Sequence, residues 1–146
     1  MYDSSNTLKK HTVAVHYMRL IFDYLQRKNY SIDQFLLEIH LDKSIFDQPN
    51  ERIDFQVFNQ VCHVLEDKFQ HPNLGIYLGQ LVTTGHLGPH GFALMTSSNA
   101  RELMQQNMHY SALTIDAGSN VFERKGHEFI RYWKSNLEGN RRLGKL

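Results

Sequence analysis

The sequence is poor in the features that mark secreted and membrane proteins. It has one cysteine, Cys62, in 146 residues, so no disulfide can form within the chain. This excludes the class of small extracellular domains that disulfides hold together. No apolar run approaches the roughly 20 residues that a membrane-spanning helix needs, and the polar start, MYDSSNTLKK, lacks the apolar segment of a secretion signal. We therefore expect a reduced, cytoplasmic compartment and no membrane contact.

An excess of charge of either sign is also missing. Sixteen lysine and arginine residues stand against fifteen acidic ones, which gives a formal net charge of +1. Such a balance supplies no strong field for nucleic-acid phosphates, so this chain alone is not expected to bind DNA. The hydrophobic content of 41%, with 12% aromatic residues, is enough for a folded core. The length fits one domain.

Helical spacing of apolar residues dominates the first part of the chain. After a polar segment at 1–11, which we expect to be a flexible tail, the pattern predicts a helix from Thr12 to Lys28. Ser31 and Gln34 have the spacing of a capping box, in which the side chain of each residue accepts a hydrogen bond from the backbone amide of the other. A short second helix is therefore predicted to begin after Ser31.

Two aspartates mark the next helix starts. Asp42 is placed to cap a single helical turn, and Asp54 to cap a longer helix that ends near Phe69. Cys62 lies on the apolar stripe of that helix. Free cysteine is usually buried and inert in such a place, so we expect it to pack rather than to react.

Glycines punctuate the middle of the chain. Gly75 and Gly79 lie one turn apart in a helix expected at 73–82, where glycine costs about 1 kcal/mol relative to alanine. We expect another backbone to pass close to both, most simply the short proline-initiated helix that follows Gly88 and contains Gly91. A phosphate-binding loop is the alternative for this spacing, but no strand precedes it and no lysine-serine pair follows it.

A further capping box is formed by Asn99 and Glu102, at the start of the next predicted helix. One side of this helix is polar and is expected to face water. The other side is expected to face the core, and it carries Ala100, Leu103, Met104, Met108 and Ser111.

The spacing of apolar residues changes from helical to alternating after residue 116. The segments 121–124 and 127–133 flank a glycine-containing turn and predict a β-hairpin. The fold class is therefore α+β and predominantly α-helical, with about six helices followed by a C-terminal β-hairpin. We expect a single domain at 12–134, cut short of its full extent, and a basic polar tail at 135–146.

Nothing in the residues predicts catalysis. His86 and His90 have the best spacing for metal ligands, but they lie across a glycine-proline step and cannot share one helix face. The sequence has no H-E-x-x-H or C-x-x-C motif, and no serine lies in a G-x-S-x-G turn. We therefore assign no catalytic residue, no metal and no cofactor.

Three motifs carry a resemblance to a known family. They are L-G-I-x-L-G from Leu74, L-G-x-x-G-F-A-L-M from Leu87, and the capped helix with Glu102, Leu103, Tyr110 and Leu113. Together they resemble the N-terminal domain of AraC-type transcription regulators, in its largely helical, arabinose-binding-domain-like branch. The similarity covers about residues 12–133.

This resemblance implies an effector-binding and dimerisation domain followed by a separate DNA-binding domain with two helix-turn-helix motifs. That second part is absent from this chain. The expected partners are a small-molecule effector of unknown identity, a second copy of the chain, and DNA only through the missing domain. The family has no fixed ligand motif, so it assigns no ligand residue. The free strand edge of the hairpin, rich in aromatic residues, is where we expect a second copy to pair.

A ligand site is expected between the glycine-containing segment and the hairpin. His90 and Phe92 flank that segment, and Arg131 and Trp133 lie on one face of the second strand. An apolar wall, a stacking surface and one cation suit a small organic anion or an amphipathic metabolite. Alternatively, Trp133 fills the core beneath the hairpin and Arg131 faces water. A helical protein-interaction module without a pocket, or an enzyme, stays open as another class of function.

Overall fold

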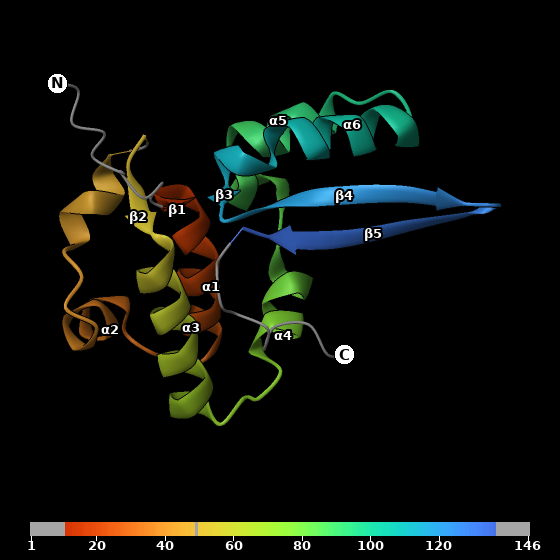
Figure 1. Ribbon diagram of the computed structural model, residues 1–146. Helices are drawn as coiled ribbons and strands as arrows, with labels where there is room; N and C mark the ends of the chain where they lie inside the picture. Colours follow the sequence, from red (N-terminus) through yellow and green to blue (C-terminus); the bar gives the residue numbers. More distant parts are fainter. Residues whose placement is uncertain (1–10, 49, 137–146) are drawn as a thin grey trace, which may run out of the picture.

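A computed structural model describes residues 11–48 and 50–136 of the chain. It has a helical body, a small sheet at one end of that body, and a long hairpin that extends away from it (Figure 1). The described residues form the helices α1 (Arg19–Arg27), α2 (Ile32–Glu38), α3 (Phe55–Phe69), α4 (Leu74–Leu81), α5 (Pro89–Met95) and α6 (Ala100–Tyr110). They form the strands β1 (Thr12–Ala14), β2 (Arg52–Asp54), β3 (Ile115–Asp116), β4 (Gly118–Lys125) and β5 (Glu128–Ser135). Short 3₁₀-helices are η1 (Val15–Met18), η2 (Lys43–Asp47), η3 (Thr84–Leu87) and η4 (Ser111–Leu113).

The predominantly helical α+β class is confirmed in outline, with six α-helices in the described part of the chain. Strands are more extensive than expected, because a second antiparallel sheet is present. The tails expected at 1–11 and 135–146 lie almost wholly outside the described residues. None of the helices described is both long enough and apolar enough to cross a bilayer.

The second sheet corrects the first predicted helix. Residues from Thr12 onward form β1, the central strand of a three-stranded antiparallel sheet in the order β2-β1-β3, and the helix begins only at Arg19. Val13 pairs with Ile53 on one side and with Ile115 on the other. Those partners are far away in sequence, so local spacing could not indicate them, and β-branched residues such as Val13 suit a strand.

Arg52 fastens this sheet to the end of the α6 segment. Its Nε donates to the Thr12 hydroxyl at 2.7 Å, and its Nη1 donates to the Leu113 carbonyl at 2.8 Å. Its Nη2 donates to the carbonyls of Thr12 at 3.3 Å and Ala112 at 3.1 Å. One guanidinium thus joins β1, β2 and η4.

Helix α1 lies at the centre of the helical body and packs against α2 and α4. Its buried side chains, Leu20, Ile21, Tyr24 and Leu25, join Leu65 of α3 and Leu74 of α4 in one core. Burying each of these side chains is worth about 1.5 to 3 kcal/mol. Cys62 is half-buried against this core, and burial raises its pKa to about 12, which fits a packing role.

The caps expected at Asp42 and Asp54 are confirmed, and the cap at Ser31 is confirmed in part. Asp42 and Asp54 accept hydrogen bonds from the amides of Ser44 and Gln56, at 2.8 and 2.9 Å. Ser31 accepts from the amide of Gln34 at 3.3 Å.

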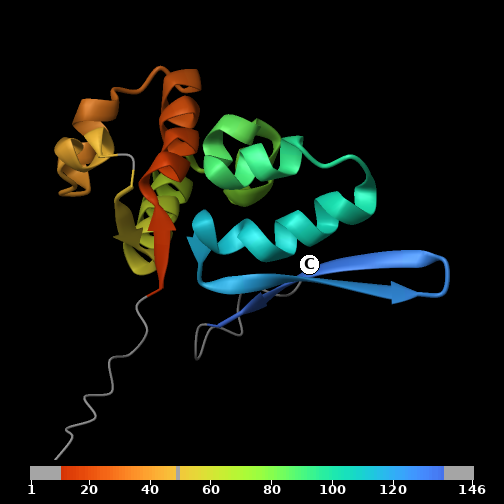
Figure 2. The same ribbon diagram turned by 90° about the horizontal axis from the view of Figure 1, so that it is seen from above.

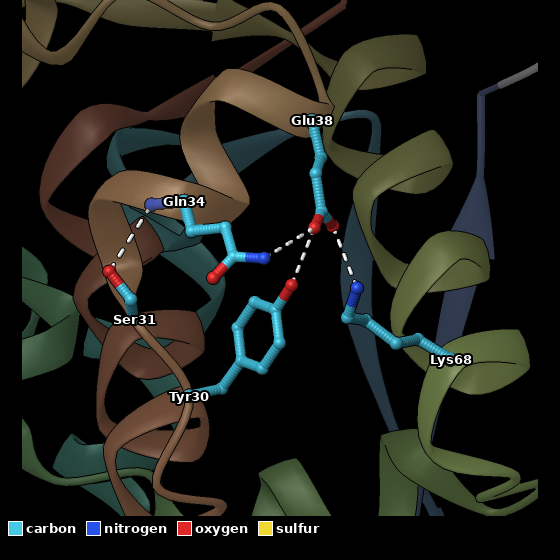
Figure 3. Close-up of polar contacts among 5 residues, drawn as sticks. All are labelled: Tyr30, Ser31, Gln34, Glu38 and Lys68. Atoms are coloured by element: carbon cyan, nitrogen blue, oxygen red, sulfur yellow. Dashed lines mark hydrogen bonds and ion pairs between the residues drawn. The ribbon is translucent and has the colours of Figure 1, made fainter.

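The reciprocal half of the capping box at Ser31 is absent. The Gln34 side chain instead donates to the carboxylate of Glu38 at 3.4 Å, because Glu38 lies one turn further along the same helix face (Figure 3). That carboxylate also accepts from the Tyr30 hydroxyl and from Lys68 of α3, the latter at 2.8 Å. A polar cluster therefore joins α2 to α3, and the Lys68 hydrogen bond is the main cause that lowers the pKa of Glu38.

The prediction of a close backbone beside Gly75 and Gly79 is wrong. A Cβ added at either position would meet nothing within 4 Å. The close approach is at Gly91 instead, where an added Cβ would lie 2.1 Å from the Thr84 carbonyl oxygen of η3. Gly88 begins α5 with φ of +56°, a conformation that side chains disfavour.

Helix α6 begins as predicted but buries less. Asn99 accepts from the Glu102 amide at 3.0 Å, while the Glu102 carboxylate accepts from the amide of Ser98 at 2.7 Å rather than from that of Asn99. The predicted core face is wrong for Ala100, which is exposed, and for Leu103 and Met108, which are 43% and 48% exposed. The reason is that α6 lies at the edge of the molecule and packs mainly against α5 and β4 (Figure 2).

The predicted hairpin is confirmed and is longer than expected at its base, and its turn lies one residue later, at Gly126 and His127. β4 and β5 pair from Gly118–Ser135 at the base to Lys125–Glu128 at the tip, where Gly126 has φ of +62°. The base lies beside α6 and η4, and the tip projects past the helices (Figures 1 and 2). This places the base of the hairpin over the helical body.

Candidate functional site

A cavity of about 460 Å³ lies between the base of the hairpin and the helical body. This volume is in the range of small-molecule sites, roughly 300 to 1,000 Å³. Its lining comes from nearly every element of the second half of the chain, together with one residue of η1. The lining residues are Tyr17, Gly79, Val82, Leu87, His90, Leu94, Asn107, Ser111, Thr114, Ile115, Asn120, Arg131 and Trp133.

His90 is the most deeply placed titratable group of this cavity, with 5% of its surface exposed. Its Nδ1 is 3.2 Å from the Thr114 hydroxyl oxygen, and that hydroxyl donates its own proton to the Leu87 carbonyl at 3.2 Å. With that hydroxyl donating to Leu87, the imidazole donates from Nδ1, and Nε2 of the neutral ring is the acceptor. Nε2 is buried and has no partner at good hydrogen-bond geometry in the described structure.

Burial is the largest cause that lowers the pKa of His90 below its usual value of 6.5. The positive charge of Arg131 acts in the same direction, and a long side-chain hydrogen bond with Asn107 acts against both. The imidazole is therefore neutral at pH 7. It offers the cavity one uncharged acceptor atom.

Arg131 supplies the cationic group and is held by a chain of two asparagines. Its Nε and Nη2 both donate to the Asn120 side-chain oxygen, at 3.1 and 2.9 Å. The Asn120 amide in turn donates to the side-chain oxygen of Asn107 on α6 at 3.3 Å. This chain fixes the guanidinium at the cavity and ties β5 and β4 to the helical body.

Trp133 forms the wall on the hairpin side and lies next to Asn120 in the strand register. It is 44% exposed, so it does not fill the main core, which lies among the helices. A side chain at Gly118 would come within 2.6 Å of its ring, so the glycine leaves the indole room to lie against β4. Leu87, Leu94 and Ile115 are apolar members of the opposite side.

The structure thus brings together three of the four predicted site residues, His90, Arg131 and Trp133. Phe92 does not line the cavity, and 72% of its surface is exposed. The geometry of α5 explains this, since His90 and Leu94 lie one turn apart on the inward face, whereas Phe92 is two residues from His90 and points away. Gly79 borders the same cavity, so the space beside it is part of the site.

Sequence reasoning missed the polar partners Asn107, Thr114 and Asn120. Asn120 could have been found only from the hairpin register, which pairs it with Trp133. Asn107 had no such signal, since an asparagine in a helix is usually solvated.

The histidine pair considered for a metal serves other purposes. His86 Nδ1 accepts from the amide of Thr83 at 2.9 Å, and its Nε2 lies 3.0 Å from the Asp23 carboxylate. His86 therefore joins η3 to α1, whereas His90 faces the cavity. Within 11–48 and 50–136, no three metal-ligating side chains lie close enough to hold an ion.

A helical body with a partly enclosed, mixed polar and apolar cavity under a hairpin defines a ligand-binding class of domain. The chain belongs to the family described as the arabinose-binding domain of AraC transcription regulators, N-terminal, whose profile matches residues 30–142. The predicted resemblance to AraC-type regulators is therefore confirmed.

Among curated proteins, the chain is similar to the ornithine utilization regulator of Pseudomonas aeruginosa, strain PAO1. The two are 26% identical over 98 residues, which is 67% of this chain and 29% of that protein. The chain thus matches less than a third of the length of this relative.

Proposed function

We propose that this chain is the effector-binding and dimerisation domain of a cytoplasmic AraC-type transcription regulator, with DNA bound through a domain outside this sequence. The observation that carries the proposal is the cavity in which His90, Arg131 and Trp133 meet. Membership of the family supports the regulatory role. The effector is a small molecule that fits about 460 Å³.

The position of the cavity suggests how an effector would act. Arg131 and Trp133 belong to β5, whereas His90 and Leu94 belong to α5. A molecule that touches both sides favours the arrangement in which the hairpin base is seated on the helices, and a ligand shifts an equilibrium by its differential affinity for the two states. The output would then be a change in how the hairpin is presented to a neighbouring domain or subunit.

A catalytic role has little support in this site. The lining contains no aspartate, glutamate or cysteine, and its histidine is neutral and tied to Thr114. Groups that could exchange protons or attack a substrate are thus few. We infer a binding function without turnover.

Self-association is supported by apolar side chains that the described fold leaves uncovered. On β5 these are Phe129, Ile130 and Tyr132, and both strands of the two-stranded sheet have a free edge. A second copy that pairs along β5 would cover them. The alternative of a helical protein-interaction module draws on Phe92, Met95, Leu103 and Met108, which are also exposed.

The test is a ligand screen by thermal unfolding of the chain. It covers amino acids, sugars, carboxylic acids and polyamines, and it includes ornithine because the Pseudomonas aeruginosa relative is named for ornithine utilization. A ligand at a hundred times its dissociation constant stabilises the folded state by about 2.7 kcal/mol, which is several degrees for a domain of this size.

The matched variants are Trp133→Ala and Phe129→Ala. Both residues lie on the same face of β5, but only Trp133 borders the cavity. The proposal expects the first variant to lose the shift of any hit and the second to keep it. A screen without any hit, or a hit whose shift survives Trp133→Ala and Arg131→Ala, would contradict an effector site in this cavity.

A further inference from the structure

The lining of the cavity carries positive charge and no negative charge. Arg131 is the sole permanently charged side chain among the thirteen lining residues, and none of them is acidic. An ammonium group in this space would find no carboxylate partner and would be repelled by the guanidinium. An anionic group would find a partner at once.

Arg131 has the means to hold such an anion. Its Nε and Nη2 are engaged with the oxygen of Asn120, which is a neutral acceptor and does not compensate the charge. Arg131 makes no ion pair with the acidic residues that the structure describes. The N–H groups of its Nη1 are free to donate to a ligand. A carboxylate is the planar group that a guanidinium fits best.

His90 adds a second requirement. Its Nε2 is a buried acceptor without a partner, on the α5 side of the same cavity. A buried acceptor left unpaired costs free energy, which a donor on the ligand would recover. In the tautomer that donates from Nδ1 to Thr114, this atom is an acceptor.

We infer that the effector is a small organic monocarboxylate whose apolar body carries a hydroxyl or N–H group. The carboxylate lies on Arg131, the donor group faces His90 Nε2, and the body lies between Trp133 and the apolar side chains of the helical body. This inference rests on the proposed effector role of the cavity. It adds that amines and polyamines are excluded.

The experiment compares matched compounds by calorimetric titration and thermal unfolding of the full chain. One series is 3-(4-hydroxyphenyl)propanoate, its primary amide and the corresponding amine, together with 3-phenylpropanoate, which lacks the hydroxyl. Hydroxylated alkyl carboxylates of six to ten carbons, with their amides and amines, form a second series. We expect each carboxylate to bind at least ten-fold more tightly than its amide, no binding of the amines, and weaker binding when the hydroxyl is removed.

Variants connect these preferences to the two residues. Arg131→Gln should abolish the preference for carboxylate over amide, whereas Arg124→Gln, on the same hairpin but outside the cavity lining, should preserve it. His90→Phe should abolish the preference for the hydroxylated compound, with exposed His109→Phe as its control. If His90→Phe fails to fold, the comparison of the hydroxylated and plain acids on the unaltered chain still decides this part.

The failures are distinguishable. If amines or polyamines without a carboxylate bind more tightly than the acids and their effect requires Trp133, the effector role stands and the carboxylate inference is overturned. If acids and amides bind equally, the assigned role of Arg131 is wrong. If no compound of either charge changes the unfolding temperature in this or the broader screen, the effector role itself fails and the inference with it.

Discussion

The guanidinium of Arg131 on β5 donates two hydrogen bonds to a single oxygen of Asn120 on β4, at 3.1 and 2.9 Å. The two residues are diagonal neighbours on one face of the hairpin, since Asn120 pairs with Trp133 and Arg131 with Phe122. Because Asn120 is 5% exposed, the pair sets the position of the cationic group from a buried base. The geometry of the site thus depends on a residue that carries no charge.

That dependence can be measured by a double-mutant cycle. We expect Asn120→Ala and Arg131→Ala to be coupled by roughly 0.5 to 1.5 kcal/mol in urea unfolding, because each removes the partner of the other. The matched cycle of Asn120→Ala with Arg124→Ala should give a coupling near zero. Additive effects of Asn120→Ala and Arg131→Ala would mean that the hydrogen bonds contribute nothing to the folded state.

Two glycines offer a matched pair of stability predictions. Gly91→Ala should destabilise the fold by about 1 to 3 kcal/mol, because the new methyl group would overlap the Thr84 carbonyl. Gly75→Ala, in the open helix α4, should be neutral or stabilise by up to about 1 kcal/mol. Urea unfolding of both variants checks this, and a stabilising Gly91→Ala would contradict the packing of α5 on η3.

Stability should fall on mild acidification. His16 and His90 both have pKa values lowered by burial, so below about pH 6.5 the unfolded chain binds protons that the folded chain resists. The free energy of unfolding should therefore be flat from about pH 8 to 7 and decline from 6.5 downward. His90→Gln should reduce the slope. A slope that is unchanged in His90→Gln and in His16→Gln would assign the decline to other groups.

A further loss is expected near pH 4 from the cluster at α2 and α3. The pKa of Glu38 is lowered by its hydrogen bonds, with that of Lys68 first, so its contribution is present above the ordinary glutamate pKa and is lost as the pH falls through the lowered value. Glu38→Gln should flatten this acidic part of the curve. It should leave the part between about pH 7 and 6 unchanged, since no carboxylate of ordinary pKa titrates there.

Self-association is testable on the unaltered chain. We expect a dimer in sedimentation equilibrium at concentrations of about 100 μM, with Ile130→Lys shifting the mass toward the monomer because a lysine on an exposed strand opposes pairing. Arg101→Lys on the wet side of α6 is a conservative control. A monomer at all concentrations would leave the exposed aromatic residues of β5 without the partner proposed here.

Caps and the hairpin could be predicted from the sequence because they depend on residues within a few positions of one another. Asp42, Asp54 and Asn99 each bond an amide two or three residues ahead, which spacing alone reveals. The strand at Val13 could not be predicted in this way, because its partners, Ile53 and Ile115, are 40 and 102 positions further along the chain.

The candidate site divides in the same way. His90, Arg131 and Trp133 were predictable because unusual residue types stand at a helix start and on one strand face. Phe92 was wrongly assigned to the site, because the sequence alone does not show which side of the helix faces the cavity. Asn107 and Asn120 meet across the gap between α6 and β4, and that meeting depends on how the hairpin is seated.

The central position of β1 in its sheet has a consequence for how the cavity is assembled. β3 contributes Ile115 to the cavity wall, and β3 is held in its sheet by β1, from the other end of the described chain. No segment that omits Thr12–Ala14 can therefore reproduce the cavity, even if it retains every lining residue from Val82 onward. During synthesis the site is completed only after β5 has emerged and β3 has paired with a strand made about a hundred residues earlier. The ability to bind a ligand is therefore a test of whole-domain folding. Ligand binding and long-range chain closure should consequently stabilise one another.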